Sequence, residues 1–453
     1  MNLKVCIIGG AGYVGLITGV GLAYLGHQVI NVDIDEGRLA HLQAGNPVIY
    51  EDHLESALRQ VLTEGKLRFS SNLQTSVAES DIIFIAVGTP AQDDGQADLS
   101  QVIEVSEDLA HFANAYKLIV VKSTVPVGTV ELVRSILCRN KREGKDFDIA
   151  SNPEFLREGK GLYDFFFPNR IVVGTLSSKA RQWLYDLYAP LIGGEFKVPE
   201  GLENHPLRKH VPVVDTDTAS AQMIKYASNA FLATRVSFIN EIAGLCERVN
   251  ADIKEVALGM GFDPRIGSSY LEAGLGFGGP CLEKDLKALI KIAEANGYEP
   301  RVLRSALDRN AQQLNDVMGK VKQLAGDLLY KKIITVFGLT FKSGTNDVRN
   351  SLSMRLIEQL EREGAIVHAH DPLGLEEARL LHPQAYYFED PYEAAAHADA
   401  LVVATDWPHF IELDFSRLKA MMASPSMVDA RNLLHARGLR ELGFRYLGIG
   451  IKV

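Results

Sequence analysis

The sequence predicts an α/β protein with two doubly wound domains, each built on a mostly parallel sheet and joined by a central helical region. Short β-branched runs alternate with helical patterns at the start of the chain, and the same alternation returns after residue 333. Between them, residues 218–250 place apolar residues at spacings of three and four, as in a long helix. We therefore expect three segments, residues 1–200, 215–325 and 326–453.

Composition narrows the classes of function. The 453 residues are 47% hydrophobic and carry a formal net charge of -10, without a basic cluster. We therefore expect no nucleic acid and no membrane surface as a partner. The uncharged run 5–26 has the hydropathy of a membrane span, but its many glycines favour a strand, a turn and a helix. The four cysteines are scattered, which argues against disulfides and zinc and favours reduced thiols in the cytoplasm.

The first segment carries the pattern of a dinucleotide-binding, Rossmann-like domain. A buried strand over 3–8 leads into GGAGYVG, in which Gly10, Gly12 and Gly15 fit G-x-G-x-x-G. These glycines allow a tight turn, approach of a pyrophosphate and close packing of helix on strand. A second strand ends at Asp33, where a carboxylate binds a ribose 2′-hydroxyl and repels a 2′-phosphate, so NAD is favoured. The alternative is an ordinary turn with a surface aspartate.

Further strands are predicted over 81–87, 117–121 and the run that begins at residue 149. Ligands of open α/β sheets bind beyond the carboxyl ends of strands, although Thr and Ser there also cap turns. The polar side chains at these ends are Thr89, Ser123, Thr124, Glu154 and Glu158. The polar stretch 199–210 is predicted to be a linker or surface loop.

The central segment contains the candidate nucleophile. In GLGFGGPCLEKD, Cys281 follows a glycine loop and falls in the first turn of a predicted helix, a location that stabilises a thiolate. Asp285 lies one turn further along that helix. The alternative, a buried inert cysteine, suits Cys6 and Cys246 better because both lie in apolar patterns. Lys225 and Asn229 share a face of the long helix, and their alternative is a solvated surface.

A dinucleotide domain and a reactive thiol together suggest one chemistry. Hydride removal from an alcohol gives an aldehyde, which a thiol traps as a thiohemiacetal. A second hydride removal gives a thioester, and water releases the acid.

The last segment repeats the strand–helix alternation without the glycine motif, with strands predicted over 333–339, 365–372, 400–404 and 427–429. Cations just past these strand ends suit anionic phosphates: Lys342, Arg349 and Arg431. His368 and His370 alternate on one strand, but no third ligand has a suitable spacing, so no metal is predicted.

Nearly end to end, the chain resembles the UDP-glucose/GDP-mannose dehydrogenase family of NAD-dependent nucleotide-sugar dehydrogenases. The motifs that carry the resemblance are GGAGYVG, VDID, VGTP, STVPVGT, NPEFLREG, PNRIVVG, IKYASNAFLATRVSFINE, DPRIG, GFGGPCLEKD, GLTFKSGTNDVR and DARN. The resemblance implies four-electron oxidation of the C6 alcohol of UDP-glucose to UDP-glucuronate, with two NAD⁺ and one water. GDP-mannose or another nucleotide sugar is the near alternative.

The resemblance also implies roles for individual residues. Cys281 is the nucleophile, and Lys225 with Asn229 stabilises the developing oxyanion. Asp285 and Thr124 organise water and proton transfers, and Glu154 acts as acid and base. The implied cofactor contacts are Gly10, Gly12, Tyr13, Val14, Gly15, Asp33, Arg38, Thr89, Thr124, Glu158, Lys284 and Arg349. The implied substrate contacts are Glu154, Phe155, Leu156, Lys225, Asn229, Arg265, Gly278, Lys342 and Arg431. Arg265 acts from a partner subunit, because the family's central helix forms a homodimer.

This chain departs from the family pattern beside the thiol. It has CLEKD where CFPKD is usual, so Glu283 is unexpected, and we predict that its carboxylate points to solvent. DARN replaces DGRN, and HDP replaces YDP. Two other classes of function remain open, a single-step NAD hydroxy-acid dehydrogenase that needs no thiol and a non-catalytic NAD-sensing protein.

Overall fold

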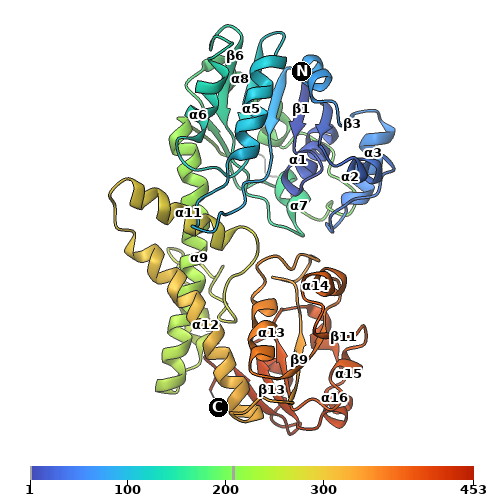
Figure 1. Ribbon diagram of the computed structural model, residues 1–453, viewed down its shortest axis with the longest axis vertical. Helices are drawn as coiled ribbons and strands as arrows, with labels where there is room; N and C mark the ends of the chain where they lie inside the picture. Colours follow the sequence, from blue (N-terminus) through green and yellow to red (C-terminus); the bar gives the residue numbers. More distant parts are fainter. Residues whose placement is uncertain (1–2, 207–209, 453) are drawn as a thin grey trace. The chain divides into compact units, whose positions relative to one another are not determined.

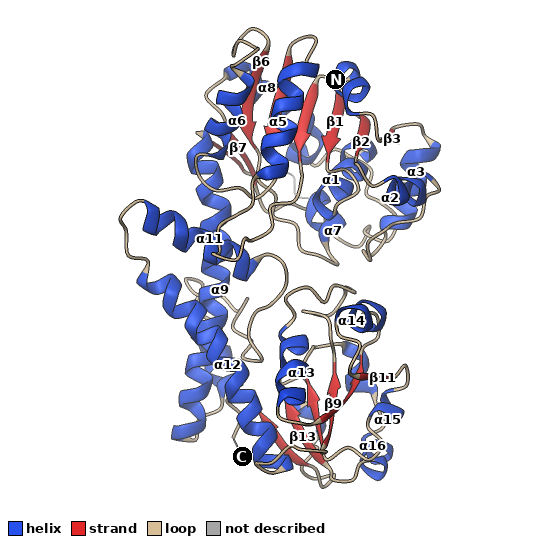
Figure 2. Ribbon diagram, viewed as in Figure 1, coloured by secondary structure: helices blue, strands red, loops and turns tan. Residues whose placement is uncertain are grey.

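The computed structural model describes residues 3–206 and 210–452 (Figure 1). The chain divides into two compact units, Met1–Ser228 and Asn229–Val453. In each unit, helices flank a sheet (Figure 2). The predicted α/β class with two parallel-dominated sheets is therefore confirmed. Of the predicted linker 199–210, residues 207–209 lie outside the described part of the chain.

The described residues of the first unit form an eight-stranded sheet in the order β3-β2-β1-β4-β5-β6-β7-β8. The pair β6 and β7 is antiparallel, and the other neighbours are parallel. The strands are β1 (Lys4–Ile8), β2 (Gln28–Val32), β3 (Leu67–Ser70), β4 (Ile82–Ile85), β5 (Lys117–Val121), β6 (Phe147–Ser151), β7 (Ile171–Gly174) and β8 (Val213–Thr216). The strand order reverses between β1 and β4, so a ligand crevice is expected at their carboxyl ends.

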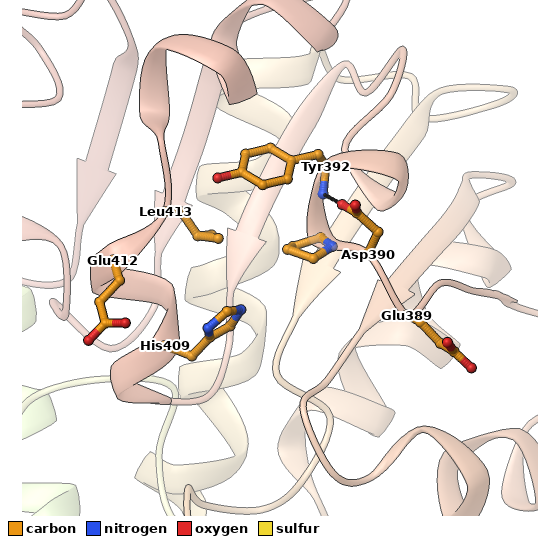
Figure 3. A pocket seen from close by; sticks show the side chains of 7 residues that line it. Glu389, Asp390, Tyr392, His409, Glu412 and Leu413 are labelled. Atoms are coloured by element: carbon orange, nitrogen blue, oxygen red, sulfur yellow. Dashed lines mark hydrogen bonds between the residues drawn. The ribbon is translucent and has the colours of Figure 1, made fainter.

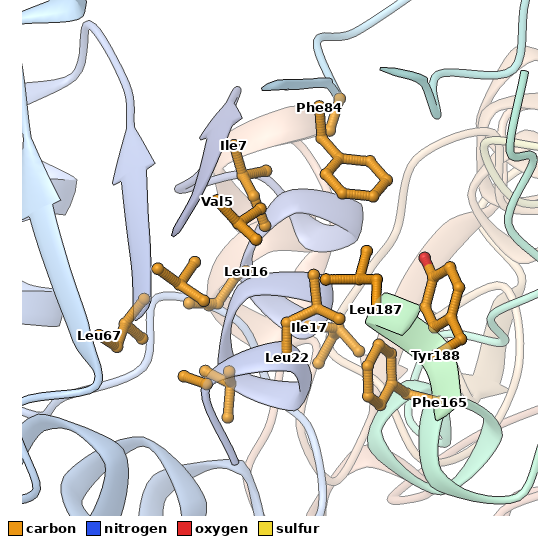
Figure 4. Close-up of a cluster of buried hydrophobic side chains, with 14 of the residues drawn as sticks. Val5, Ile7, Leu16, Ile17, Leu22, Leu67, Phe84, Phe165, Leu187 and Tyr188 are labelled. Carbon is orange, nitrogen blue, oxygen red and sulfur yellow. The ribbon is translucent and has the colours of Figure 1, made fainter. Parts of the chain in front are cut away.

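Helices cover both faces of this sheet. They are α1 (Tyr13–Tyr24), α2 (Glu36–Gln43), α3 (Leu54–Thr63), α4 (Leu73–Glu79), α5 (Ser100–Phe112), α6 (Thr129–Leu137), α7 (Gly161–Phe166) and α8 (Ser178–Gly193). Val5 and Ile7 of β1 pack in one buried cluster with α1, α7 and α8 (Figure 4), and Cys6 and Ile8 pack in another with α5 and α6. Burial on both faces explains why this strand is a continuous apolar run.

The second unit begins within α9 (Thr218–Val249) and continues with α10 (Ile253–Gly261), α11 (Leu282–Ala295) and α12 (Arg301–Ala325). Its described residues form a six-stranded parallel sheet in the order β11-β10-β9-β12-β13-β14. The strands are β9 (Ile333–Phe337), β10 (Ile366–His370), β11 (Tyr386–Tyr387), β12 (Ala400–Val403), β13 (Ser426–Asp429) and β14 (Arg445–Gly448). Its remaining helices are α13 (Leu352–Arg362), α14 (Leu375–Leu381), α15 (Pro391–Ala394), η1 (Pro408–Glu412), α16 (Phe415–Met421) and η2 (His435–Arg437).

The uncharged N-terminal run forms β1, a turn and α1, as the glycines predict. Over residues 3–206 and 210–452, no helix is long and apolar enough to span a bilayer. The first sheet extends past residue 200, because β8 pairs with β7. The three-segment domain division itself stays a prediction.

Candidate active site

The glycine turn after β1 has the shape of a dinucleotide cradle. Gly9 has φ +83°, and a Cβ on Gly15 would lie 2.1 Å from the Gly9 carbonyl oxygen. A Cβ on Gly10 would lie 2.5 Å from the Cβ of Asn31 on β2. The N-cap of α1 is Gly12, which has no side chain to occupy the first turn. Backbone N–H groups at such a helix start bind phosphate, so these residues fit a dinucleotide.

Asp33 lies beside this turn. Its Oδ2 accepts a hydrogen bond from the Ala11 backbone N–H at 2.9 Å, so the end of β2 is fastened to the glycine turn. Tyr13 starts α1 and donates its hydroxyl to Glu51 Oε2 at 2.8 Å. Burial raises the pKa of the Tyr13 hydroxyl, and the Glu51 carboxylate raises it further. Val14 packs on the core of the first unit.

Arg38 pairs with Asp35 at 3.6 Å on the exposed start of α2. Arg38 and Asp33 therefore belong to neighbouring segments at the carboxyl end of β2.

Polar side chains link the carboxyl ends of β4 and β5. Thr89 donates its hydroxyl to the Thr124 carbonyl oxygen at 2.8 Å, and Ser123 donates to the Val87 carbonyl oxygen at 2.7 Å. Both side chains thus act in the turns themselves. Glu158 lies in the loop between β6 and α7.

A buried ion pair follows β6. Lys225 Nζ lies 2.8 Å from Glu154 Oε1, and the two side chains are only 6% and 7% exposed. The other carboxylate oxygen of Glu154 accepts the Leu156 backbone N–H. Burial raises the pKa of the Glu154 carboxyl, but the Lys225 ammonium outweighs it and holds that pKa below its ordinary value. Lys225 is therefore not the solvated lysine of the alternative interpretation.

Phe155 lies next to this pair. The Arg170 guanidinium stands 3.6 Å from the centre of the Phe155 ring, and Lys225 Nζ is 5.4 Å from it. Arg170 belongs to the motif PNRIVVG, but its contact with Phe155 depends on tertiary packing that the motif does not reveal.

In the second unit, Cys281 is the N-cap of α11 and is exposed. It precedes the first helical residue, so it stands one position before the first turn in which it was predicted. Its carbonyl oxygen accepts the Asp285 backbone N–H at 2.9 Å. Cys6 and Cys246 are buried, and burial raises the pKa of Cys6 to about 12. The contrast between inert and accessible thiols is thus visible in the structure.

Asp285, one turn after Cys281 on α11, is almost fully buried. Its Oδ2 accepts a hydrogen bond from the Asn229 amide at 2.6 Å, and its Oδ1 lies 2.6 Å from Lys284 Nζ. Two donors on different helices therefore fix one carboxylate within the second unit.

The glycine loop before Cys281 packs on the start of α13. Gly279 has φ +84° and donates its N–H to the Asn350 carbonyl oxygen at 3.2 Å. A Cβ on Gly278 would lie 2.7 Å from the same oxygen, so a side chain there has no room.

The prediction for Glu283 is wrong. Its side chain is 10% exposed and pairs with Lys287 Nζ at 2.7 Å and Arg355 Nη2 at 2.8 Å. Burial raises the pKa of the Glu283 carboxyl, but the two cations outweigh it and lower that pKa overall. The carboxylate stays ionised and joins α11 to α13. The prediction failed because the position of Glu283 in the sequence does not reveal a cation on a distant helix.

Arg431 lies at the strand-order reversal of the second sheet. Its Nε donates to the Ala404 carbonyl oxygen after β12 at 2.9 Å, and its Nη2 donates to the Phe341 carbonyl oxygen at 3.4 Å. Lys342 Nζ stands 5.7 Å from the Phe341 ring centre. Two of the three predicted phosphate-binding cations, Lys342 and Arg431, thus both lie near Phe341.

Two other predicted contacts lie on the surface of the second unit. Arg349 pairs with Asp347 at 2.5 Å, and Arg265 pairs with Asp263 at 2.5 Å. The Arg265 side chain is 86% exposed.

Asp371 was missed by the sequence analysis, although HDP marked its place. Its Oδ2 accepts the Leu339 N–H at 2.6 Å and the Trp407 Nε1–H at 3.1 Å, and its Oδ1 accepts the Gly374 N–H at 2.8 Å. It therefore holds together the loops after β9, β10 and β12.

The pocket of about 550 Å³ between α15 and η1 contains none of the predicted residues (Figure 3). Its charged side chains include Glu389, Asp390 and Glu412, which would repel a pyrophosphate. His368 and His370 each bond a backbone carbonyl through Nδ1.

Most of the chain matches one family of known proteins. Residues 3–192 match the NAD binding domain of the UDP-glucose/GDP-mannose dehydrogenase family, 219–312 its central domain, and 335–436 its UDP binding domain. The chain belongs to this family.

Two curated family members named UDP-glucose 6-dehydrogenase match over nearly their whole length. The Bacillus subtilis protein TuaD is 40% identical over 99% of this chain and 93% of its own length. The Rhizobium meliloti protein is 42% identical over 99% of both chains. The solved UDP-glucose dehydrogenase of Pyrobaculum islandicum has a TM-score of 0.89 and 36% identity over 100% of this chain and 98% of its own.

Proposed function

We propose that this protein oxidises the C6 alcohol of UDP-glucose to the carboxylate of UDP-glucuronate, using two NAD⁺ and one water. The observation that carries the proposal is the accessible thiol of Cys281 at the start of α11. Relatives that match nearly the whole chain are named for UDP-glucose. In the proposed reaction, the Cys281 thiol supplies the covalent step of a double oxidation.

The residues of the first unit fit NAD. The glycine turn leaves room for a pyrophosphate at the start of α1, and Asp33, beside that turn, is proposed to bind the ribose hydroxyls. Bound NAD⁺ supplies a hydride acceptor in each of the two oxidations. The proposed cofactor contacts include Tyr13, Val14, Arg38, Thr89, Thr124, Glu158, Lys284 and Arg349.

The Cys281 thiolate adds to C6 of the aldehyde and forms a C–S bond, and the carbonyl electrons move to oxygen. Loss of a hydride from this thiohemiacetal gives a thioester. Water then adds to the thioester carbon, the C–S bond breaks, and the thiolate returns. Across the cycle, one alcohol and one water become one carboxylate, with two hydrides and three protons released.

The remaining polar groups serve these steps. Lys225 stabilises the oxyanion, and Glu154, ionised beside it, exchanges protons with substrate and water. Asn229 and Lys284 fix Asp285 so that it orients water near the thiol, with Thr124 contributing to proton transfer.

Lys342 and Arg431 are proposed to bind the UDP pyrophosphate, because guanidinium and ammonium groups pair with phosphate oxygens. Gly278, Phe155 and Leu156 complete the proposed sugar contacts.

We further propose a homodimer built on α9 and α10. Phe231, Phe238 and Leu245 are 62%, 48% and 54% exposed and recur every seven residues along α9. A row of exposed apolar side chains at this spacing suits a second helix. Arg265 then reaches the substrate of the partner subunit. The reduced state of all four cysteines is consistent with a cytoplasmic protein.

The decisive experiment counts NADH per substrate. Purified protein is offered UDP-glucose, GDP-mannose and N-acetylhexosamine nucleotides, and we expect two NADH for each UDP-glucose. One NADH per substrate indicates the single-step alternative, and turnover with GDP-mannose alone indicates the other nucleotide sugar.

A matched pair of variants tests the thiol. Cys281→Ser should bind both ligands and lose acid formation. Cys138→Ser, at the other exposed cysteine, should keep wild-type turnover. Ordinary acid yield from Cys281→Ser would contradict the covalent route.

A further inference from the structure

Lys122 is a buried lysine that the proposed reaction does not use. It follows β5 directly, and its backbone N–H bonds the Ile85 carbonyl oxygen at the end of β4 at 2.9 Å. Its Nζ donates to Asn152 Oδ1 at 3.1 Å, and Asn152 follows β6. The ammonium therefore lies at the carboxyl ends of three neighbouring strands.

The direct hydrogen-bond partner of this ammonium is neutral. The Tyr188 hydroxyl donates to the same Asn152 Oδ1 at 2.7 Å, and the Phe84 ring centre is 5.8 Å from Lys122 Nζ. Phe84 and Tyr188 both belong to the apolar core beside α1 (Figure 4). In the described residues, the hydrogen bonds of Nζ go to oxygens of Asn152 alone.

Burying the Lys122 ammonium without a charged hydrogen-bond partner costs free energy, and lysine is rarely buried in this way. A residue with a purely structural role would not need to be a lysine. Burial lowers the pKa of Lys122 from 10.5 to about 8, against the opposing effect of Glu154. The group therefore changes its charge within the range in which enzymes work.

Two charged groups act on Lys122, the Glu154 carboxylate and the Lys225 ammonium. Lys122 in turn favours the ionised form of Glu154. With both lysines protonated, two positive charges and one negative charge leave this buried group with a net charge of +1.

We propose that Lys122 is a positioning residue of the reaction, a second cation that acts through the Glu154–Lys225 pair. Its charge keeps Glu154 ionised to lower pH. This inference rests on the proposed function for its role, but its electrostatic content concerns the first unit alone.

Lys122→Met in the full chain removes the charge and keeps most of the stem. The control is Lys117→Met, a lysine at the opposite end of β5 whose Nζ donates to backbone oxygens at 78 and 80. Removing a nearby positive charge raises the pKa of a carboxyl group. We expect the acid limb of kcat/KM for UDP-glucose to rise by about half a pH unit or more in Lys122→Met, and not in the control.

A second measurement does not depend on turnover. The pKa of Lys122 in the folded protein is about 8, below its ordinary 10.5, so the unfolded chain holds more protons between these values. The stability of wild type relative to Lys122→Met is therefore lowest below pH 8 and recovers towards pH 10.5. We expect Lys122→Met to be at least as stable as wild type at pH 7.

The outcomes separate the two proposals. An unshifted acid limb in an active Lys122→Met overturns the positioning role and leaves the proposed function intact. Marked loss of stability at pH 7 also overturns it, since Lys122 is then a structural lysine. Absence of UDP-glucose oxidation by wild type rejects the proposed function. In that case the acid-unfolding midpoint decides, and an equal midpoint in the variant and wild type overturns the coupling to Glu154.

Discussion

Replacing Lys225 by methionine should destabilise the first unit strongly at neutral pH. The substitution leaves the Glu154 carboxylate buried, with the Leu156 N–H as its direct donor. Removing one partner of a buried ion pair typically costs about 3–5 kcal/mol. Because Lys122 still favours the ionised form of Glu154, we expect the lower end of this range, about 3 kcal/mol.

The loss should depend on pH in a defined direction. In wild type the pKa of Glu154 is lowered, so the pair stabilises the fold above the ordinary glutamate pKa, and this contribution disappears as pH falls through the folded value. Without Lys225, burial is the largest influence and raises the pKa of Glu154. The variant therefore gains stability relative to wild type as pH falls from 7 towards 4.5.

The chain offers a clean probe, because it has two tryptophans and each unit contains one, Trp183 and Trp407. In a Trp407→Phe background, urea unfolding followed by fluorescence reports on the first unit. The double variant Lys225→Met with Glu154→Gln should recover most of the loss, since no unpaired charge remains. A Lys225→Met midpoint within error of wild type at pH 7 would refute the reasoning.

Three further substitutions test other parts of the structure. Gly15→Ala places a Cβ 2.1 Å from the Gly9 carbonyl oxygen, so NAD affinity by calorimetry should fall at least about tenfold; unchanged affinity contradicts the cradle. Glu283→Gln breaks two ion pairs and should lower the free energy of unfolding in urea by about 1–2 kcal/mol. The control Glu358→Gln, which breaks an exposed ion pair within α13, should lower it by less than about 0.5 kcal/mol. Phe238→Glu should convert the proposed dimer to monomer in light scattering, and a persistent dimer would place the interface elsewhere.

Local patterns of apolar residues predicted most of the fold. The run KLIVV forms β5 over the predicted residues Lys117–Val121, and the long helix runs over Thr218–Val249, close to its prediction. Such segments can be recognised in the sequence because the side-chain period of a strand differs from that of a helix. The strands β7 and β8 were not predicted as strands, since four residues are too few to show a clear strand pattern of their own.

The residues of the candidate site were easier to predict from the sequence than the contacts that they make. The position of Cys281 at a helix start follows from a glycine–proline break in the sequence. The inward direction of Glu283 depends on Arg355, which lies 72 positions later on α13. Pairings over such distances are set by tertiary packing, and one sequence contains no record of them.

The exposure of Cys281 has a cost beyond catalysis. A thiol open to a sugar aldehyde is equally open to hydrogen peroxide, which converts a thiolate to sulfenic acid and removes the nucleophile. Cys6 and Cys246 are sheltered from this chemistry by the hydrocarbon around them. Cys138 is also exposed but has no role in the proposed reaction, so oxidative inactivation should begin at Cys281. An added dithiol should reverse the inactivation while the oxidation stops at sulfenic acid.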